Sequence, residues 1–189
     1  MQTLKDEVKQ KILDAATEEF LVDGYTNSSL RTIAAQAGIT IGNIYSYFSS
    51  KEDLFDQVVS PAWEALNNLM TMQMYTGGGS EELLGISRSI SRVFIDNRQQ
   101  CFILLNGSGG TRYQNLRESI EDFISDRLHQ AMEARCDAVD PLFTKALAAA
   151  LFSGFVTVFS HYGGDEERLG RLVRDLLMAL LGNLMDWEG

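Results

Sequence analysis

Cysteine and proline are scarce in this sequence, and each shortage excludes a class of protein. Only 2 prolines occur among 189 residues, so long helices are possible over most of the chain. The 2 cysteines, Cys101 and Cys136, lie far apart and form no CxxC pattern, which argues against a disulfide scaffold or a zinc site. We interpret both as ordinary core thiols of a protein in a reducing compartment.

Uncharged apolar runs long enough to cross a membrane are also missing. The longest candidate, ALAAALFSGFVTVFSHYGG, is broken by Ser153, Gly154 and Ser160, and we interpret it as a buried helix. The charged N-terminal segment MQTLKDEVKQK is followed by no apolar signal core. With 45% hydrophobic residues, the chain is expected to be a globular, cytoplasmic protein without membrane contact.

Apolar residues recur at helical spacing throughout, and no alternating strand pattern occurs. The sequence therefore predicts an all-α fold of about nine helices. The first helix is expected to end near Asp23-Gly24. A capping-box pattern, Ser49-x-x-Glu52, is expected to open the fourth helix, in which Pro61 either introduces a kink or begins a new helix with Ser60 as its cap.

The last two helices are expected at 141–162 and 165–187. Asp140-Pro141 supplies an N-cap and a first-turn proline, and Gly163-Gly164 ends the first of the two. Leucines three and four residues apart give the second a continuous apolar face. We predict that these helices pair with their copies in a second subunit as a four-helix bundle, the alternative being that both are purely intramolecular core.

Positive charge is in short supply, because the chain has a net charge of −10. Residues 1–51 are nearly neutral, so 52–189 carry almost all of this negative charge. Between Asp23 and Glu52 no carboxylate occurs, whereas Arg31 and Lys51 remain. A surface free of acids can approach a phosphate backbone even on an acidic protein.

Two short helices within this acid-free segment have the pattern of a helix-turn-helix. They are expected at 29–37 and 40–47, joined by the turn QAGIT. Gly38 suits a left-handed turn position, and Ile44 and Phe48, four residues apart, anchor the second helix on the core. The outer face of such a helix enters the DNA major groove. On spacing alone, a plain helical hairpin with tyrosines as filler remains the alternative.

The ordered motifs of this segment resemble those of a known family. The stretch KILDAATEEFLVDGYTNSSLRTIAAQAGITIGNIYSYFSSKEDLF resembles the N-terminal domain of the TetR family of one-component transcriptional repressors. The resemblance covers about the first fifty-five residues. It implies a DNA-binding domain at 1–50 and a helical ligand-binding and dimerisation domain at 51–189.

The resemblance also implies roles for individual residues. Thr40, Ile41, Gly42 and Asn43 match base-facing positions of the recognition helix. Positions that hold the phosphate backbone are matched by Tyr45, Tyr47 and Lys51, and contacts at the start of the preceding helix by Ser29 and Arg31. The family often has histidine at position 47 and a basic residue at 49, where this chain has Tyr47 and Ser49. Fewer cations predict a shallower dependence of DNA affinity on salt.

The middle helices, 81–135, are expected to enclose a pocket for an unknown small-molecule inducer. Its candidate lining residues are aromatic or aliphatic: Phe94, Phe102, Leu105, Tyr113, Phe123, Phe152, Phe155 and Phe159. Arg92, Arg98, Arg112, His129 and His161 are candidates for a polar ligand contact. Each of these residues has a plainer alternative as core filler or as a solvated side chain.

The predicted function is that of a homodimeric repressor which binds a pseudo-palindromic double-stranded operator and is released by its ligand. No HExxH, GxSxG or P-loop pattern occurs, so we expect neither an enzyme nor catalytic residues, metal ligands or a cofactor. The alternative function is a helical protein-interaction module without DNA binding.

Overall fold

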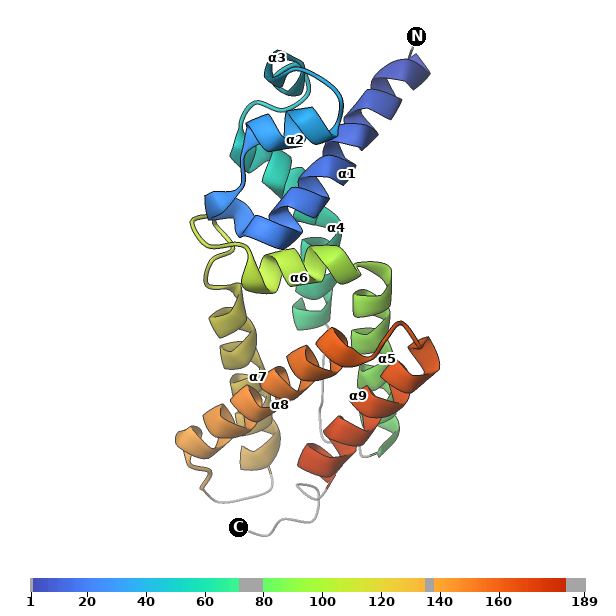
Figure 1. Ribbon diagram of the computed structural model, residues 1–189. Helices are drawn as coiled ribbons and strands as arrows, with labels where there is room; N and C mark the ends of the chain where they lie inside the picture. Colours follow the sequence, from blue (N-terminus) through green and yellow to red (C-terminus); the bar gives the residue numbers. More distant parts are fainter. Residues whose placement is uncertain (1, 72–79, 135–137, 183–189) are drawn as a thin grey trace. The chain divides into compact units, whose positions relative to one another are not determined.

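The computed structural model describes residues 2–71, 80–134 and 138–182, and the described residues form helices and turns without strands. Nine helices lie in these ranges, which confirms the predicted all-α class (Figure 1). They are α1 (Gln2–Asn27), α2 (Leu30–Gln36), α3 (Ile41–Ile44), α4 (Lys51–Thr71), α5 (Ser80–Asp96), α6 (Arg98–Asn106), α7 (Leu116–Glu133), α8 (Pro141–His161) and α9 (Glu166–Leu181).

The helices pack as two compact units. Unit 1 comprises Met1–Ala65 and Asn97–Leu116, and unit 2 comprises Leu66–Asp96 and Arg117–Gly189. The boundary between the units therefore falls inside α4, and α6 packs on α1 within unit 1. The functional division expected at residue 50 stays a prediction, since packing alone divides the chain elsewhere.

The core of unit 1 is aromatic. The Phe55 ring packs edge to face with Phe20 and with Tyr25, at ring-centroid distances of 5.0 Å and 5.2 Å. The Tyr113 ring, from the segment after α6, packs against the rings of Phe55 and Trp63. Such pairs strengthen packing beyond the apolar area they bury. The core of unit 1 thus joins α1 and α4 to a segment far along the sequence.

The first helix is interrupted where the sequence predicts its end. Gly24 has φ 68° and ψ 175°, a backbone conformation that only glycine adopts without strain. Gly24 also lies against the backbone of Gly107, and the Tyr25 amide donates a 2.7 Å hydrogen bond to the Gly107 carbonyl. A side chain on Gly107 would meet the Gly24 Cα and the Phe20 carbonyl oxygen at 3.2 Å. The two glycines allow a direct backbone contact between the end of α1 and the end of α6.

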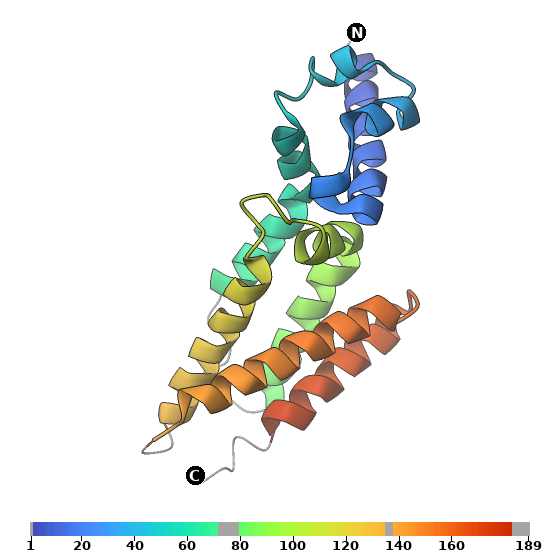
Figure 2. The ribbon, with the colours of Figure 1, turned by 60° about the vertical axis from the view of Figure 1, so that its left-hand side comes forward.

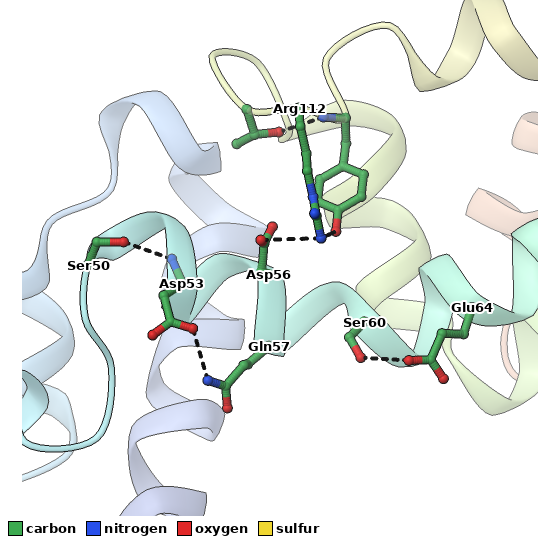
Figure 3. A network of polar contacts seen from close by, with 9 residues as sticks. Ser50, Asp53, Asp56, Gln57, Ser60, Glu64 and Arg112 are labelled. Atoms are coloured by element: carbon green, nitrogen blue, oxygen red, sulfur yellow. Dashed lines mark hydrogen bonds and ion pairs between the residues drawn. The ribbon is translucent and has the colours of Figure 1, made fainter.

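The capping box of α4 is shifted by one residue from the predicted Ser49-x-x-Glu52. The Ser50 hydroxyl accepts a 3.0 Å hydrogen bond from the Asp53 amide (Figure 3). The Asp53 carboxylate accepts a 2.7 Å bond from the Ser49 amide. Asp53 is also bonded to Gln57 one turn later. From the third helical position, the Asp53 carboxylate thus accepts from the amide before the cap rather than from the cap amide of a standard capping box.

Helix α4 continues through Pro61, so the alternative in which a new helix begins there is wrong. The missing proline amide leaves one intrahelical hydrogen bond unmade. The Ser60 hydroxyl is bonded to Glu64 rather than to a helix terminus (Figure 3).

In unit 2, α9 packs against both α5 and α8, and α8 and α9 run side by side in both views (Figures 1 and 2). Asp140 caps α8 through the Leu142 amide, and Asp165 caps α9 through the Arg168 amide. The predicted Asp140-Pro141 start and Gly163-Gly164 stop of α8 are confirmed. By length and composition alone, α8 is one helix that could cross a membrane, a test that core helices of soluble proteins also pass.

Candidate nucleic-acid interface

The turn between α2 and α3 is built by backbone hydrogen bonds around Gly38. This glycine has φ 69°, as predicted, and the Ile39 amide donates to the Ala34 carbonyl at 2.9 Å while the Gly38 amide donates to Ala35. This pattern is a Schellman motif, which ends a helix and redirects the chain. It sets α3 at a fixed angle to α2, as a helix-turn-helix requires.

Helix α3 is anchored by two buried side chains. Ile44 and Phe48 are both 1% exposed, and Ile33 and Ala34 of α2 are also buried. The α-helix itself spans only Ile41–Ile44, shorter than the predicted 40–47. Hydrogen bonds from Ser46 to Asn43 and from Tyr47 to Ile44 tighten the following residues into turns. The predicted anchors are therefore confirmed, while the regular helix ends early.

The opposite face of α3 is exposed. Thr40, Gly42 and Asn43 lie on the surface, Tyr45 is 56% exposed, and Ile41 is 38% exposed. The Thr40 hydroxyl accepts a 3.2 Å hydrogen bond from the Asn43 amide and so caps α3. A side chain at Gly42 would meet only that hydroxyl, at 3.7 Å, so packing within the protein does not require a glycine there. Five of the predicted contact residues are thus exposed to solvent.

The start of α2 is already occupied by a carboxylate. Glu19, only 5% exposed, accepts a 2.9 Å hydrogen bond from the Ser29 amide, while the Ser29 hydroxyl accepts a bond from the Arg31 amide. The Ser29 amide is therefore not available to a phosphate. The Arg31 side chain is exposed and remains the accessible cation at this helix start.

Lys51 is held inward instead of standing free on the surface. Its ammonium group donates a 2.7 Å hydrogen bond to the Ser28 carbonyl and lies 4.6 Å from the centre of the Tyr25 ring. Partial burial lowers the pKa of Lys51, and the nearby Glu19 carboxylate opposes this change. Lys51 therefore links the start of α4 to the connection between α1 and α2. It also places a positive charge next to the C-terminal end of α1.

Sequence reasoning missed two lysines of α1 beside the recognition segment. The Lys5 ammonium lies 5.9 Å from the centre of the half-buried Tyr47 ring, and the Lys9 ammonium lies 5.8 Å from the centre of the Phe48 ring. These cation–π contacts place positive charge next to Tyr47. Their signal in the sequence is weak, because spacing within α1 does not reveal which side of the helix α3 occupies.

The eight predicted pocket residues fall into both units. Phe102, Leu105 and Tyr113 lie in unit 1, and the other five lie in unit 2. Phe94 and Phe159 stack face to face with ring centroids 3.4 Å apart, so each ring is covered by the other. None of the eight residues lines either of two clefts found in the described parts of the chain, of 540 Å³ in unit 2 and 830 Å³ in unit 1.

Of the candidates for a polar ligand contact, Arg92 and Arg112 form ion pairs within their own units. Arg92 pairs with Asp96. Arg112 pairs with Asp56 at 3.3 Å and donates a 2.6 Å hydrogen bond to the Tyr113 hydroxyl (Figure 3). That hydroxyl raises the pKa of Arg112, and burial raises the pKa of Tyr113. Of these residues, only Arg92 lines one of the two clefts.

One of the two cysteines, Cys101, lies in the described part of the chain. Cys101 is fully buried in α6, and burial raises the pKa of its thiol to about 12. A thiol that stays protonated at neutral pH is unreactive, which confirms the interpretation as a core residue. Cys136 lies outside the described residues. No group of three or more metal-ligating side chains occurs in the parts of the chain that are described.

The fold and the exposed face of α3 define the class of protein: the chain carries a helix-turn-helix of the kind that binds duplex DNA. The family profile for bacterial regulatory proteins of the tetR family matches residues 12–58. Over 93% of its length, the chain is 31% identical to an "Uncharacterized HTH-type transcriptional regulator" of Haemophilus influenzae, of which 85% is covered. The chain therefore belongs to the TetR family of transcriptional regulators.

Other relatives match over shorter stretches. The chain is 43% identical to the HTH-type transcriptional regulator AcrR of Shigella flexneri over 31% of its own length and 25% of that protein. The alignments to this relative and to SrpR of Pseudomonas putida thus span about a quarter of those proteins. A TetR-family regulator from Streptomyces coelicolor A3 shares the fold, with a TM-score of 0.70, 21% identity and 90% of each chain covered. These relatives are regulators, not enzymes.

Proposed function

We propose that this protein is a cytoplasmic, homodimeric repressor which binds a pseudo-palindromic operator through α3 and is released by a small-molecule ligand. The observation that carries the proposal is the two-sided character of α3. Ile44 and Phe48 are buried beneath it, while Thr40, Asn43 and Tyr45 stand exposed above it. No carboxylate lies between Asp23 and Glu52 in sequence to repel a phosphate backbone.

The exposed groups suit the two tasks of a DNA-binding face. Asn43 presents an amide that can pair with the edge of an adenine, and the Ile41 side chain suits contact with a thymine methyl group. The hydroxyls of Tyr45 and Tyr47 donate hydrogen bonds to phosphates, with Arg31 and Lys5 supplying positive charge nearby. Gly42 allows a close approach of the backbone to a base pair.

Dimerisation is supported by the apolar surface of α8. Leu142 is 71% exposed and Phe143 is 40% exposed, although both side chains are large and apolar. Exposed apolar groups of this kind, gathered on one element, mark a surface that is covered in the working protein. A second subunit placed against α8 and α9 would cover them and supply the second recognition helix that specific binding needs.

Ligand release is proposed as a population shift. A ligand in unit 2 favours a conformation whose α4 no longer holds the two recognition helices at the spacing of one DNA turn. Pro61 weakens α4 at one hydrogen bond, which makes this helix a candidate pivot. If Pro61→Ala left both operator affinity and induction unchanged, the pivot would lie elsewhere.

The proposal is tested by footprinting the purified protein on the DNA that flanks its own gene. We expect protection of two half-sites related by a twofold axis, about 10 base pairs apart or a multiple of that distance. A protein-interaction module without DNA binding would protect no site at any concentration. Sedimentation at micromolar concentration tests the dimer separately, and a monomer alone would refute it.

A further inference from the structure

An arginine-lined cleft of 540 Å³ lies on unit 2, between α5 and α9. Its volume is within the ordinary range for sites of small molecules. Residues at helical spacing line it from both sides, among them Ser87, Arg88 and Arg92 from α5 and Glu167, Arg171 and Arg174 from α9. Each helix therefore turns one continuous face toward the cleft.

The charge of this cleft is opposite to that of the protein. Four of the 16 basic residues of the chain line it, together with a single carboxylate, in a protein with 26 acidic residues. Guanidinium groups bind phosphate and carboxylate groups through paired hydrogen bonds, which lysine does not provide. Arginines on two facing helices can hold one anion from both sides.

The acidic residues beside these arginines form only solvent-exposed ion pairs with them. Arg92 pairs with Asp96 and Arg174 with its sequence neighbour Asp175, and in both pairs the side chains are exposed. Arg171 lies 3.8 Å from Glu167, whose side chain is 91% exposed. Exposed ion pairs of this kind contribute little and exchange readily. Arg88 is exposed and makes no hydrogen bond or ion pair with any residue in the described ranges.

Gly170 forms part of the wall of the cleft. It lies in the middle of α9, where glycine is less favourable than alanine, and its φ is not positive. A Cβ built at Gly170 would meet no atom within 4 Å. Neither backbone conformation nor packing within the protein therefore requires a glycine there. Its effect is to keep the wall of the cleft open, with the small Ser87 and Ser91 opposite on α5.

We propose that this cleft binds a small organic anion bearing two or more phosphate or carboxylate groups, held by Arg88 and Arg92 from α5 and by Arg171 and Arg174 from α9. The site is separate from the DNA-binding face and does not depend on operator binding. Glu167 opposes the anion and moves outward when the ligand binds.

Calorimetric titration of the full-length protein with inorganic pyrophosphate and with citrate, at constant ionic strength, tests the proposal. We expect saturable binding of at least one of them, and the preferred probe distinguishes phosphate from carboxylate chemistry. The double variant Arg88→Gln with Arg171→Gln is expected to weaken binding by about tenfold or more. Glu167→Gln is expected to strengthen it, because it removes the one opposing charge.

Gly170→Leu fills the cleft and is expected to abolish binding. Gly85→Leu is the matched control, since Gly85 lies in α5 with no atom within 4 Å of its built Cβ and does not line the cleft. The absence of saturable binding of both anions would overturn the proposal, as would equal binding by the arginine double variant. Loss of dimerisation in Gly170→Leu alone would also overturn it, because the cleft would then be a contact between subunits.

Discussion

The Lys51 ammonium group donates a 2.7 Å hydrogen bond to the Ser28 carbonyl and lies over the Tyr25 ring. Lys51→Met removes both contacts, and we expect it to lower the free energy of unfolding by about 1–2 kcal/mol. Chemical denaturation monitored by circular dichroism measures this change. Lys11→Met, an exposed lysine of α1, is the control and should have little effect. A Lys51 variant with unchanged stability but weaker DNA binding would show that the lysine serves only the phosphates.

Asp53 makes the stability of unit 1 depend on pH. The hydrogen bond from the Ser49 amide, and a further bond from Gln57, lower the pKa of this carboxyl in the folded state. Its stabilising contribution is therefore present above the ordinary aspartate pKa of about 4 and is lost as pH falls through the lowered value.

The variant Asp53→Asn is expected to be less stable than wild type at neutral pH by about 1 kcal/mol, because it weakens the α4 cap. As pH falls through the lowered pKa of Asp53, the difference should shrink, since the wild-type carboxyl is then protonated as well. Thermal unfolding at a series of pH values measures both. A stability difference that stayed constant down to the lowest pH would contradict this role.

The backbone contact between Gly24 and Gly107 is expected to tolerate no side chain. Gly24→Ala forces alanine into φ 68° and ψ 175° and brings its Cβ to 3.3 Å from Gly107, so we expect a loss of about 1–3 kcal/mol in unfolding free energy. Gly109→Ala is the control, because its Cβ would meet only the Thr26 hydroxyl, at 3.8 Å. Equal stability of the two variants would mean that the contact contributes nothing.

Operator affinity is expected to depend only moderately on salt. Few cations stand on the DNA-binding face, and each neutralised phosphate contributes about −0.9 to the slope of log affinity against log salt. Lys5 and Lys9 add charge beside Tyr47 and Phe48, and Lys5→Gln should make the slope shallower by about one unit if Lys5 contacts a phosphate. A wild-type slope on the order of −10 would contradict this expectation.

The sequence predicted those parts of the structure that depend on local chemistry. Gly38 marks the turn because only glycine adopts its φ without strain, and Ile44 and Phe48 mark the buried side of α3 because they lie one helical turn apart. Such features need no knowledge of distant residues.

Contacts across long stretches of sequence could not be predicted in this way. Gly107 meets Gly24, and Glu19 occupies the Ser29 amide, only because the chain folds back on itself. The inward position of Lys51 likewise depends on where Tyr25 and Ser28 lie in space. The shift of the α4 cap from Ser49 to Ser50 shows that even a local motif leaves its register open when two serines are adjacent.

Binding of wild type, Asn43→Ala and Asn67→Ala to the footprinted operator, measured by fluorescence anisotropy, tests the central claim most directly. Asn43 is exposed on α3, and Asn67 is an exposed asparagine of α4 in the other unit. Loss of a base contact at Asn43 should weaken binding by about tenfold or more, at unchanged stability, while Asn67→Ala binds like wild type. Equal affinity of all three proteins for the operator would contradict the assignment of α3 as the DNA-reading element.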